Sequence, residues 1–323
     1  MNDGIDVLGL GAVAWDEFLY LDDWPPADAK RRVRLRAAQC GGITGNALVA
    51  AARFGARCAY AGRLGTDAAS HQVRAALEAE GIDTTRAVVG DAYHVNQSVI
   101  IVAENLGTRN VFSQSPGGTG ADETLPDENF IRSARVLLVD HHGVPGSIRA
   151  ARLARKAGHE VVADVERSDS PQTSELLALA NHLILSKGFA RAQTKMSHAA
   201  EATQKLWNEE RAAVVVTCGR DGCWYCATET AAAARHFPAF QVEVLDTTGC
   251  GDVFHGTYAA TLALGFDLKT RLRFASAAAA LKAGRRSGID RYPTRTEIGT
   301  SSDRARPLDQ RLSETGVHPS LIA

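Results

Sequence analysis

The sequence predicts an α/β protein with a doubly wound, mostly parallel sheet flanked by helices. Short apolar segments alternate along the chain with segments of helical composition, which is the pattern of βαβ units. Of the 323 residues, 45% are hydrophobic, which is enough for one large core. Because ligands of such sheets bind beyond the carboxyl ends of the strands, residues that carry chemistry should gather at that edge.

The predicted elements follow one another in a regular order. The apolar segment 5–10, bounded by glycine, predicts a first buried strand, and the alanine-rich segment 46–54 predicts a helix that ends before Gly55. The same alternation then continues towards the carboxyl terminus. Further strands are predicted at 59–62, 136–139, 161–164, 183–185 and 214–217, with helices at 70–80, 147–157 and 174–180.

Two segments of β character, 17–38 and 93–114, interrupt this alternation. In the first, Arg32, Arg34 and Arg36 alternate with apolar residues, which predicts a strand with one basic, wet face. In the second, two half-exposed stretches flank a turn at 105–107, which predicts a hairpin. Residues 1–298 are expected to form one domain that carries both insertions. The polar, aperiodic segment 299–323 is expected to be a loosely ordered tail.

Composition narrows the class of partner. The net charge is −1, with 36 basic and 37 acidic residues, so neither nucleic acid nor a membrane surface is an expected partner. The six cysteines follow no charged-then-apolar leader, which predicts a reducing cytoplasm rather than a secreted disulfide framework. No apolar run approaches the roughly 18 residues of a membrane-spanning helix.

The strongest chemical signal is the segment 246–252, which reads D-T-T-G-C-G-D and runs into small and apolar residues of helical type. A glycine-rich turn that opens a helix leaves backbone N–H groups pointing outward, which makes an anion site. The N–H groups come from Gly249, Cys250 and Gly251. Asp252 falls in the first helical turn beside them. A base next to fixed donors is what phosphoryl transfer needs, whereas a simple helix cap is the alternative interpretation.

Three ordered motifs resemble those of the PfkB carbohydrate kinases, the ribokinase-like family. The segment 246–252 resembles the family's D-T-x-G-A-G-D signature, with Cys250 in place of alanine. The segment 41–46, followed by 62–67, resembles a second signature, and 217–222 resembles the T-x-G-x-x-G that lines the nucleotide. The resemblance covers roughly residues 5–293. It implies an ATP-dependent sugar kinase with a ribokinase-like fold, a small β-sheet lid and a homodimer paired through that lid.

The resemblance also implies roles for individual residues. Asp252 would be the general base, and Gly249, Cys250 and Gly251 the anion hole. The expected sugar contacts are Asp16, Gly41, Gly42 and Asn46. The expected nucleotide contacts are Thr217, Gly219 and Gly222. Mg²⁺ would bridge the phosphates, and Asp246 and Thr248 are candidates to hold a monovalent cation such as K⁺.

Three further residues are candidates with a structural alternative each. Lys30, with the arginines of the first insertion, suggests an acceptor sugar that bears an acidic group, although a charged edge strand has the same composition. His142 ends a strand on the ligand side and is either a substrate contact or a loop histidine. Lys187 lies where many family members carry N-x-x-E, and it is either a phosphate contact or a surface lysine.

Two short segments and one cysteine give more specific signals. The segments 253–256 and 273–276 resemble bacterial sulfofructose kinases, but Ser113 and His142 replace their sulfonate-binding asparagine and arginine, so sulfofructose is not the predicted substrate. Cys250, at a helix N-terminus, is expected to have a lowered pKa if it is exposed.

Two other functions remain open from the sequence alone. The segment 9–14 fits G-x-G-x-x-A, the fingerprint of an NAD(P)-dependent oxidoreductase, but 25–26 is Pro-Pro and a basic stretch follows where an acidic residue is expected. A non-catalytic sugar or nucleotide sensor on the same fold is the second alternative.

Overall fold

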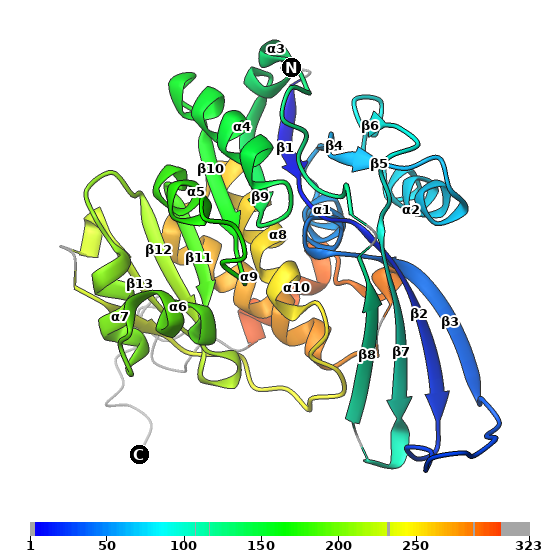
Figure 1. Cartoon of the computed structure of the whole chain (residues 1–323). Coiled ribbons are helices and arrows are strands. Elements are labelled where there is room, and N and C mark those ends of the chain that lie inside the picture. The colour runs from blue at the N-terminus through cyan, green and yellow to red at the C-terminus, as the bar shows by residue number, and fades with distance from the viewer. Residues whose placement is uncertain (1–3, 107, 116, 231–232, 287, 305–323) are drawn as a thin grey trace, which may run out of the picture.

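An eight-stranded sheet forms the middle layer of the protein in the computed structural model, which describes residues 4–106, 108–115, 117–230, 233–286 and 288–304 (Figure 1). In spatial order its strands are β14 (Arg235–Phe237), β13 (Cys223–Ala227), β12 (Ala213–Thr217), β11 (His182–Ser186), β10 (Glu160–Asp164), β9 (Ala134–Asp140), β1 (Ile5–Leu10) and β4 (Cys58–Tyr60). Only the pairings of β13 with β12 and β14 are antiparallel. The prediction of a mostly parallel sheet is confirmed.

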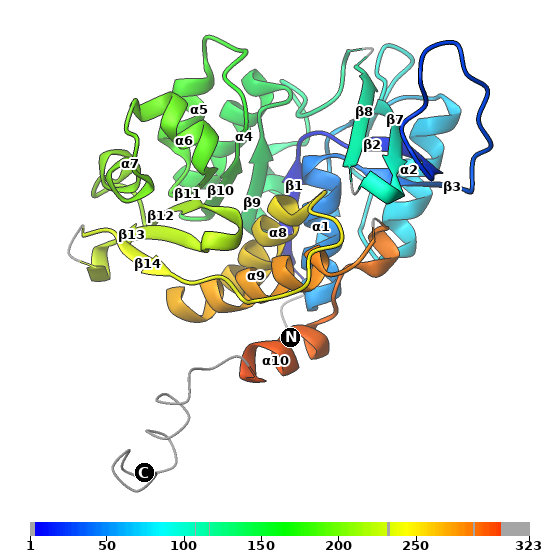
Figure 2. The same ribbon diagram turned by 90° about the horizontal axis from the view of Figure 1, so that it is seen from below.

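Helices cover both faces of this sheet (Figure 2). One face packs against α1 (Ile43–Phe54), α2 (Ala68–Ala79), α8 (Cys250–Ala263), α9 (Leu268–Ala283) and α10 (Arg295–Arg304). The other packs against α3 (Glu128–Arg132), α4 (Val144–Lys156), α5 (Thr173–Leu179), α6 (Lys187–Thr194) and α7 (Ala199–Leu206). Adjacent strand residues such as Leu137 and Leu138 enter opposite cores, which explains why these strands read as continuous apolar runs.

The two β insertions meet in a separate four-stranded sheet, which is called the lid below. Its spatial order is β3 (Leu35–Gly41), β2 (Ala14–Leu21), β7 (Asn96–Ala103) and β8 (Thr108–Gln114). β2 and β7 pair in parallel along their whole length, so segments about 80 residues apart in sequence form one layer. In Figure 1 the lid stands beside the body rather than in its layers.

The smaller elements complete the chain. A two-stranded sheet is formed by β5 (Arg63–Leu64) and β6 (Val88–Val89). The 3₁₀ turns are η1 (Glu104–Leu106), η2 (Gly219–Asp221), η3 (Thr228–Thr230) and η4 (Ile289–Arg291). η1 follows β7 in the predicted hairpin turn, and Gly107 lies outside the described residues. Across the described part of the chain, no helix is both long and apolar enough to cross a membrane.

Two sequence predictions are wrong in their bounds. The basic strand begins at Leu35, and Lys30, Arg32 and Arg34 precede it in the loop after β2. The partner strand β2 ends at Leu21, and the last residues that pair between the two strands are Tyr20 and Leu35. The N–H of Arg34 still donates to the Tyr20 carbonyl, and β2 does not extend far enough to pair with Lys30 or Arg32. The tail predicted from 299 is helical as far as 304, because α10 runs that far; 305–323 lie outside the described residues.

Candidate active site

The glycine-rich turn and helix predicted at 246–260 are present as α8 and the loop before it. Gly249 caps the helix in a left-handed conformation, with φ 75°, which glycine adopts without strain. The N–H of Cys250 donates to the Thr247 carbonyl at 3.3 Å. Within the described residues the N–H groups of Gly249 and Gly251 have no partner, and the space at Gly251 is open. The turn therefore presents free donors to a ligand.

Asp252 lies in the first turn of α8, half-buried, where it contacts the second motif. Asn46 on α1 donates its Nδ2 to Asp252 Oδ2 at 2.7 Å, although the two residues are 206 positions apart. Asn46 is only 9% exposed, and its Oδ1 is buried without a partner among the described residues. An orphaned amide oxygen beside a carboxylate is suited to accept a hydrogen bond from a ligand hydroxyl.

The pKa of Asp252 is raised well above its usual value. Desolvation is the main cause, followed by the negative charges of Asp164 and Glu166 at the end of β10. The hydrogen bond from Asn46 and the charge of His255 act in the opposite direction. A carboxylate with a raised pKa is a stronger proton acceptor than a solvent-exposed aspartate.

The buried imidazolium of His255 contacts the turn through the Gly251 carbonyl. His255 Nδ1 lies 2.8 Å from the Gly251 carbonyl and 3.0 Å from Asp164 Oδ2, and Nε2 lies 3.0 Å from the Ile184 carbonyl. Because all three neighbours are acceptors, both ring nitrogens carry protons. Burial alone would lower the pKa of His255, but the charge and hydrogen bond of Asp164 outweigh it and raise the pKa to about 9. The sequence predicts no role for His255 or Asp164.

The predicted sugar contacts Asp16, Gly41 and Gly42 lie together where the lid joins the body. A Cβ on Gly41 would lie 2.1 Å from Asp16 Oδ2, so only glycine leaves room for the carboxylate. Burial raises the pKa of Asp16, and a hydrogen bond from Ser98 opposes the shift. Gly42 has φ 85° and caps α1. Asn96, which the sequence did not point to, pairs with Ala14 nearby, and its buried Oδ1 has no hydrogen-bond partner in the part of the chain that the structure describes.

Asp140 connects these loops, and the sequence predicts no role for it either. The fully buried carboxylate accepts from the N–H of Ala12 at 2.7 Å, from Thr44 Oγ1 at 2.8 Å and from the N–H of His142 at 2.7 Å. The ring of His142 is turned to the same carboxylate, with Nδ1 3.2 Å from Oδ1. Burial would lower the pKa of His142, but Asp140 outweighs it and raises the pKa. His142 thus lies close to the predicted sugar contacts.

The predicted nucleotide contacts gather at the ends of β11 and β12. Thr217 pairs with Ser186, the residue before Lys187, and η2 starts at Gly219. Gly222 has φ 84°, and a Cβ there would lie 2.1 Å from the Phe237 carbonyl. A hollow of about 510 Å³ opens beside this turn. It is lined by Lys187, Ser197, His198, Ala199, Ala200, Glu201, Cys218, Asp221 and Trp224.

The two predicted cation contacts form one tight loop. Asp246 Oδ1 accepts from the N–H of Thr248 at 2.9 Å and from its hydroxyl at 2.7 Å. The ammonium of Lys282 lies 3.8 Å from Asp246 Oδ2, and Arg109 of the lid lies 3.8 Å from Oδ1. The sequence pattern gave no indication of either basic residue, because their neighbours in the chain do not form a motif.

Two sequence expectations meet different surroundings. Lys30 lies exposed on the loop between β2 and β3, at the far end of the lid from the turn at Gly41. Cys250 is half-buried rather than exposed, so the condition for a lowered pKa is not met, and desolvation raises its pKa to about 11. The dipole of α8 does not compensate for the lost hydration of a thiolate.

The dinucleotide fingerprint at Gly9 and Gly11 has a packing explanation. A Cβ on Gly9 would lie 2.6 Å from Leu48 of α1, and one on Gly11 would lie 2.3 Å from Asp140 Oδ2. These glycines let α1 approach β1, and β1 continues into the lid strand β2 rather than into a helix. The oxidoreductase alternative loses its main support.

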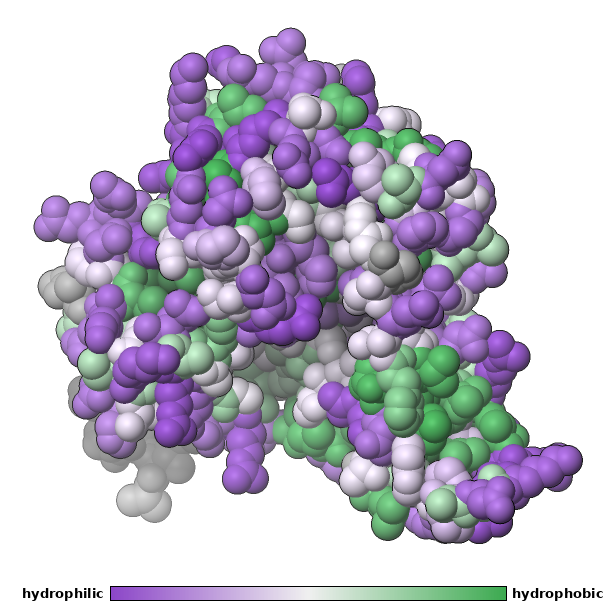
Figure 3. Space-filling model, viewed as in Figure 1, coloured by the Kyte–Doolittle hydropathy of each residue, from purple (hydrophilic) through white to green (hydrophobic). Residues whose placement is uncertain are grey.

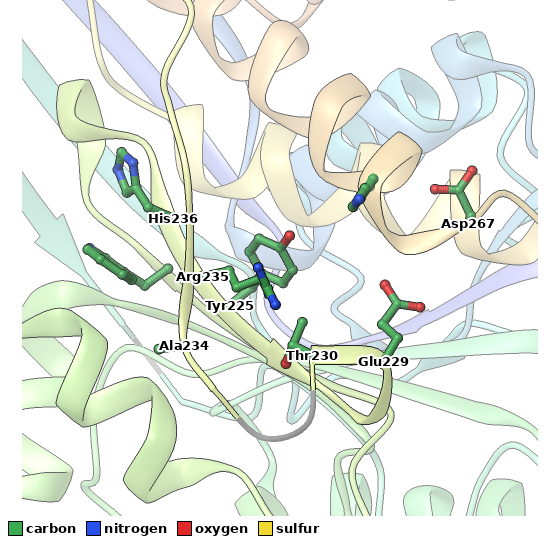
Figure 4. Close-up of a pocket in the computed structure, with 9 residues that line it drawn as sticks. Tyr225, Glu229, Thr230, Ala234, Arg235, His236 and Asp267 are labelled. Atoms are coloured by element: carbon green, nitrogen blue, oxygen red, sulfur yellow. The ribbon is translucent and has the colours of Figure 1, made fainter.

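A larger hollow, of about 890 Å³, lies at the other end of α8, between β13, β14 and the start of α9 (Figure 4). It is lined by Trp224, Tyr225, Glu229, Thr230, Ala234, Arg235, His236, Asp267 and Lys269. Because α8 is roughly 20 Å long, this hollow is far from Asp252. None of the residues predicted from the sequence lines it.

Fold and turn together define the ribokinase-like class of proteins. The model of the "pfkB family carbohydrate kinase" matches residues 11–295, so the protein belongs to the PfkB family of carbohydrate kinases.

Known proteins with similar sequences include two bacterial proteins. The bifunctional protein HldE of Nitrobacter hamburgensis is 29% identical over 86% of this chain, and the chain spans only 60% of its length. The ribokinase of Haemophilus influenzae is 26% identical over 80% of this chain and 85% of its own.

Solved structures agree with the fold. A protein of Agrobacterium tumefaciens that has been put forward as a ribokinase matches with a TM-score of 0.87 and 25% identity, over 93% of this chain and 98% of its own. Arabidopsis thaliana ribokinase, complexed with ribose and ATP, matches with a TM-score of 0.80 and 21% identity. The match covers 93% of this chain and 99% of the Arabidopsis chain.

Proposed function

We propose that the protein is an ATP-dependent kinase that transfers the γ-phosphoryl group to a hydroxyl of a sugar or sugar derivative, with Asp252 as the general base. The observation that carries the proposal is the contact between Asn46 and Asp252 beside the unpartnered N–H groups of Gly249 and Gly251. A proton acceptor, an orienting amide and an anion site thus converge on one point.

The proposed reaction is an in-line displacement. Asn46 Oδ1 accepts a hydrogen bond from the acceptor sugar, and Asp252 takes the proton of the attacking hydroxyl. The N–H groups of the turn hold the negative charge that develops on the transferring group. Asp16 and the backbone at Gly41 and Gly42 fix the remaining hydroxyls, since a carboxylate beside amides recognises a polyol.

The nucleotide would lie along Thr217, Gly219 and Gly222, with Lys187 as a phosphate contact from the hollow beside η2. The residues at the end of β10 fit a Mg²⁺ ion bound to the phosphates. Glu166 is exposed there, and its negative charge raises the pKa of Asp252. Asp164 is already paired with His255. When bound, Mg²⁺ neutralises phosphate charge while keeping several waters, and Glu166 would hold it through them.

The lid would close the sugar site and would also pair two subunits. Figure 3 shows the body hollowed where it meets the lid and apolar side chains gathered on the lid. Phe18 and Ile100 face one side of the lid and are buried, whereas Val99 and Phe112, 38% and 55% exposed, pair on the other side. Phe112 also stacks on Trp24, which is 41% exposed. An apolar outer face of this kind suits a homodimer.

The six cysteines are consistent with a place in the reducing cytoplasm. All six lie in the described residues, and four of them are buried. Cys223 and Cys226 are both buried in β13.

The test is the release of ADP from ATP and Mg²⁺ across a panel of ketoses, aldoses, acidic sugars and nucleosides. A kinase releases ADP with one class of acceptor far above the rate with water. If sugars or nucleotides bind by calorimetry yet none is phosphorylated, the protein is the non-catalytic sensor instead.

A further inference from the structure

Lys282, near the end of α9, is a lysine whose side chain is 1% exposed. Its Nζ reaches the loop before α8, where it lies 3.4 Å from the Asp246 carbonyl oxygen and 3.8 Å from Asp246 Oδ2. Burying an ammonium group is costly unless an anion compensates for the lost hydration. The head group, rather than the packing of its aliphatic stem, therefore explains a lysine at this position.

The surroundings of Asp246 show what this ammonium does. Asp246 Oδ1 holds the N–H and hydroxyl of Thr248, so the position of the carboxylate sets the path of the chain into Gly249. Arg109, 40% exposed, approaches the same oxygen from the lid. Lys282 approaches from the interior side and fixes both the carboxylate and the carbonyl of Asp246. The anion turn is thus anchored by a cation built into α9.

A bound K⁺ ion would need the same oxygen atoms, because Asp246 and Thr248 are the residues that the family resemblance offers for it. In this chain the Asp246 carbonyl already faces the ammonium of Lys282, and Cys250 Sγ lies 3.9 Å from it. The residues present at this point do not fit an additional monovalent cation. Burial lowers the pKa of Lys282, and the negative charge of Asp246 opposes that shift.

We propose that Lys282 is a positioning residue whose ammonium group takes the place of a monovalent cation, so that the kinase works without K⁺. The inference rests on the proposed function for its activity readout, but cation binding can be measured without any substrate. Lys282 acts through Asp246 on the Gly249 to Gly251 turn and does not touch the reacting atoms.

The first measurement uses the unaltered protein. The melting temperature is compared in KCl and in tetramethylammonium chloride at equal ionic strength, since any ion that binds only the folded state raises it. The proposal predicts the same melting temperature in both salts and the same kcat. A K⁺-specific rise in melting temperature, or activation by K⁺, would overturn the proposal. The comparison of melting temperatures tests K⁺ binding even if no acceptor sugar has been found.

The second measurement uses Lys282→Met, which keeps the apolar stem and removes the charge. In tetramethylammonium chloride kcat should fall about 10- to 100-fold, as when a supporting contact of a catalytic group is lost. K⁺ or NH₄⁺ should restore part of it and should raise the melting temperature of this variant alone. Full activity without added cation, or loss that neither ion rescues, contradicts the proposal.

Lys205→Met is the matched control. Lys205 on α7 also donates to a backbone carbonyl, that of Thr194, at 2.9 Å, but it lies outside the site. The control variant should keep its activity and show no response to K⁺. If Lys282→Met does not fold, the unaltered protein still decides the question through its melting temperature.

Discussion

Asp252 is held between groups that move its pKa in opposite directions. Desolvation and the charges of Asp164 and Glu166 raise the pKa, while Asn46 and His255 lower it. As a base, Asp252 works only when ionised, so activity is present above its pKa and is lost as the pH falls through it. The acidic limb of kcat/KM should therefore lie well above the usual pKa of an aspartate.

Asp164→Asn should move this limb to lower pH, because it removes the largest neighbouring charge that raises the pKa of Asp252. The measurement is kcat/KM against pH for the variant and the unaltered enzyme. Asp169→Asn is the control, since Asp169 is exposed after the same strand and pairs only with Arg167 among the described residues. If the acidic limb of the kcat/KM profile does not move in Asp164→Asn, the charge of Asp164 does not raise the pKa of the base.

Single residues of the site could be predicted where the signal is local. Gly249 and Asp252 share one turn, so a short motif was enough to identify them. Asp140, His255 and Lys282 could not be predicted, because their partners are far away in sequence. His255, for example, forms a hydrogen bond with the Ile184 carbonyl, 71 positions away in sequence. The residues next to His255 in the chain do not predict that contact.

The crossing of α1 and α8 sets the distance between Asn46 and Asp252. At Gly256 the helices are so close that a Cβ would lie 1.9 Å from the Ala47 carbonyl oxygen. In an open helix, Gly→Ala stabilises by up to about 1 kcal/mol. At this crossing the contact with the backbone determines the change in stability. The added methyl group would clash with the Ala47 carbonyl, which is part of α1 and can move only with the helix.

Gly256→Ala should lower the free energy of unfolding by about 1–3 kcal/mol, as overpacking in cores does. It should also lower kcat, since α1 carries Asn46. Gly299→Ala on α10 is the matched control, because nothing lies within 4 Å of the added Cβ there. Urea denaturation of both variants checks this prediction, and equal stability of the two would contradict it.

Among the elements, the six parallel strands of the body were predicted well, because both of their faces are buried and they read as apolar runs. The short edge strand β14 was not predicted, since its residues are mostly exposed. α9 was not predicted, since its alanine-rich segment 275–280 can lie on either face of a helix and gives no clear period. The contact of α1 with α8 could not be predicted either, because it joins the motif at 41–46 to the motif at 246–252, which are about 200 residues apart in sequence.

Across the whole protein, the two insertions were predicted as β structure, but their union in one lid was not visible in the sequence. The pairing of β2 with β7 depends on how the body brings residues 14 and 96 side by side. The loop 22–34 carries Arg32 and Arg34, which were predicted to lie in a strand, whereas Arg36 does lie in β3. Pairing partners, rather than local composition, decide where a lid strand begins.

The outer face of the lid predicts a dimer that a single charge would disrupt. Phe112→Glu should shift the protein from dimer to monomer in sedimentation velocity, because a carboxylate would be buried against the partner's apolar lid face. Val89→Glu, on β6 and 48% exposed, is the control and should stay dimeric. A monomeric unaltered protein, or a Phe112→Glu variant that remains dimeric, would refute pairing through the lid.

The most direct test is the turnover of Asp252→Asn, which keeps the shape of the side chain and removes its capacity to accept a proton. With the acceptor identified by the ADP panel, kcat should fall by about 10²–10⁴ while calorimetric affinity for the sugar stays nearly unchanged. Asp267→Asn, at the cap of α9 away from the site, should retain normal turnover. Near-normal turnover of Asp252→Asn would contradict the assignment of Asp252 as the base.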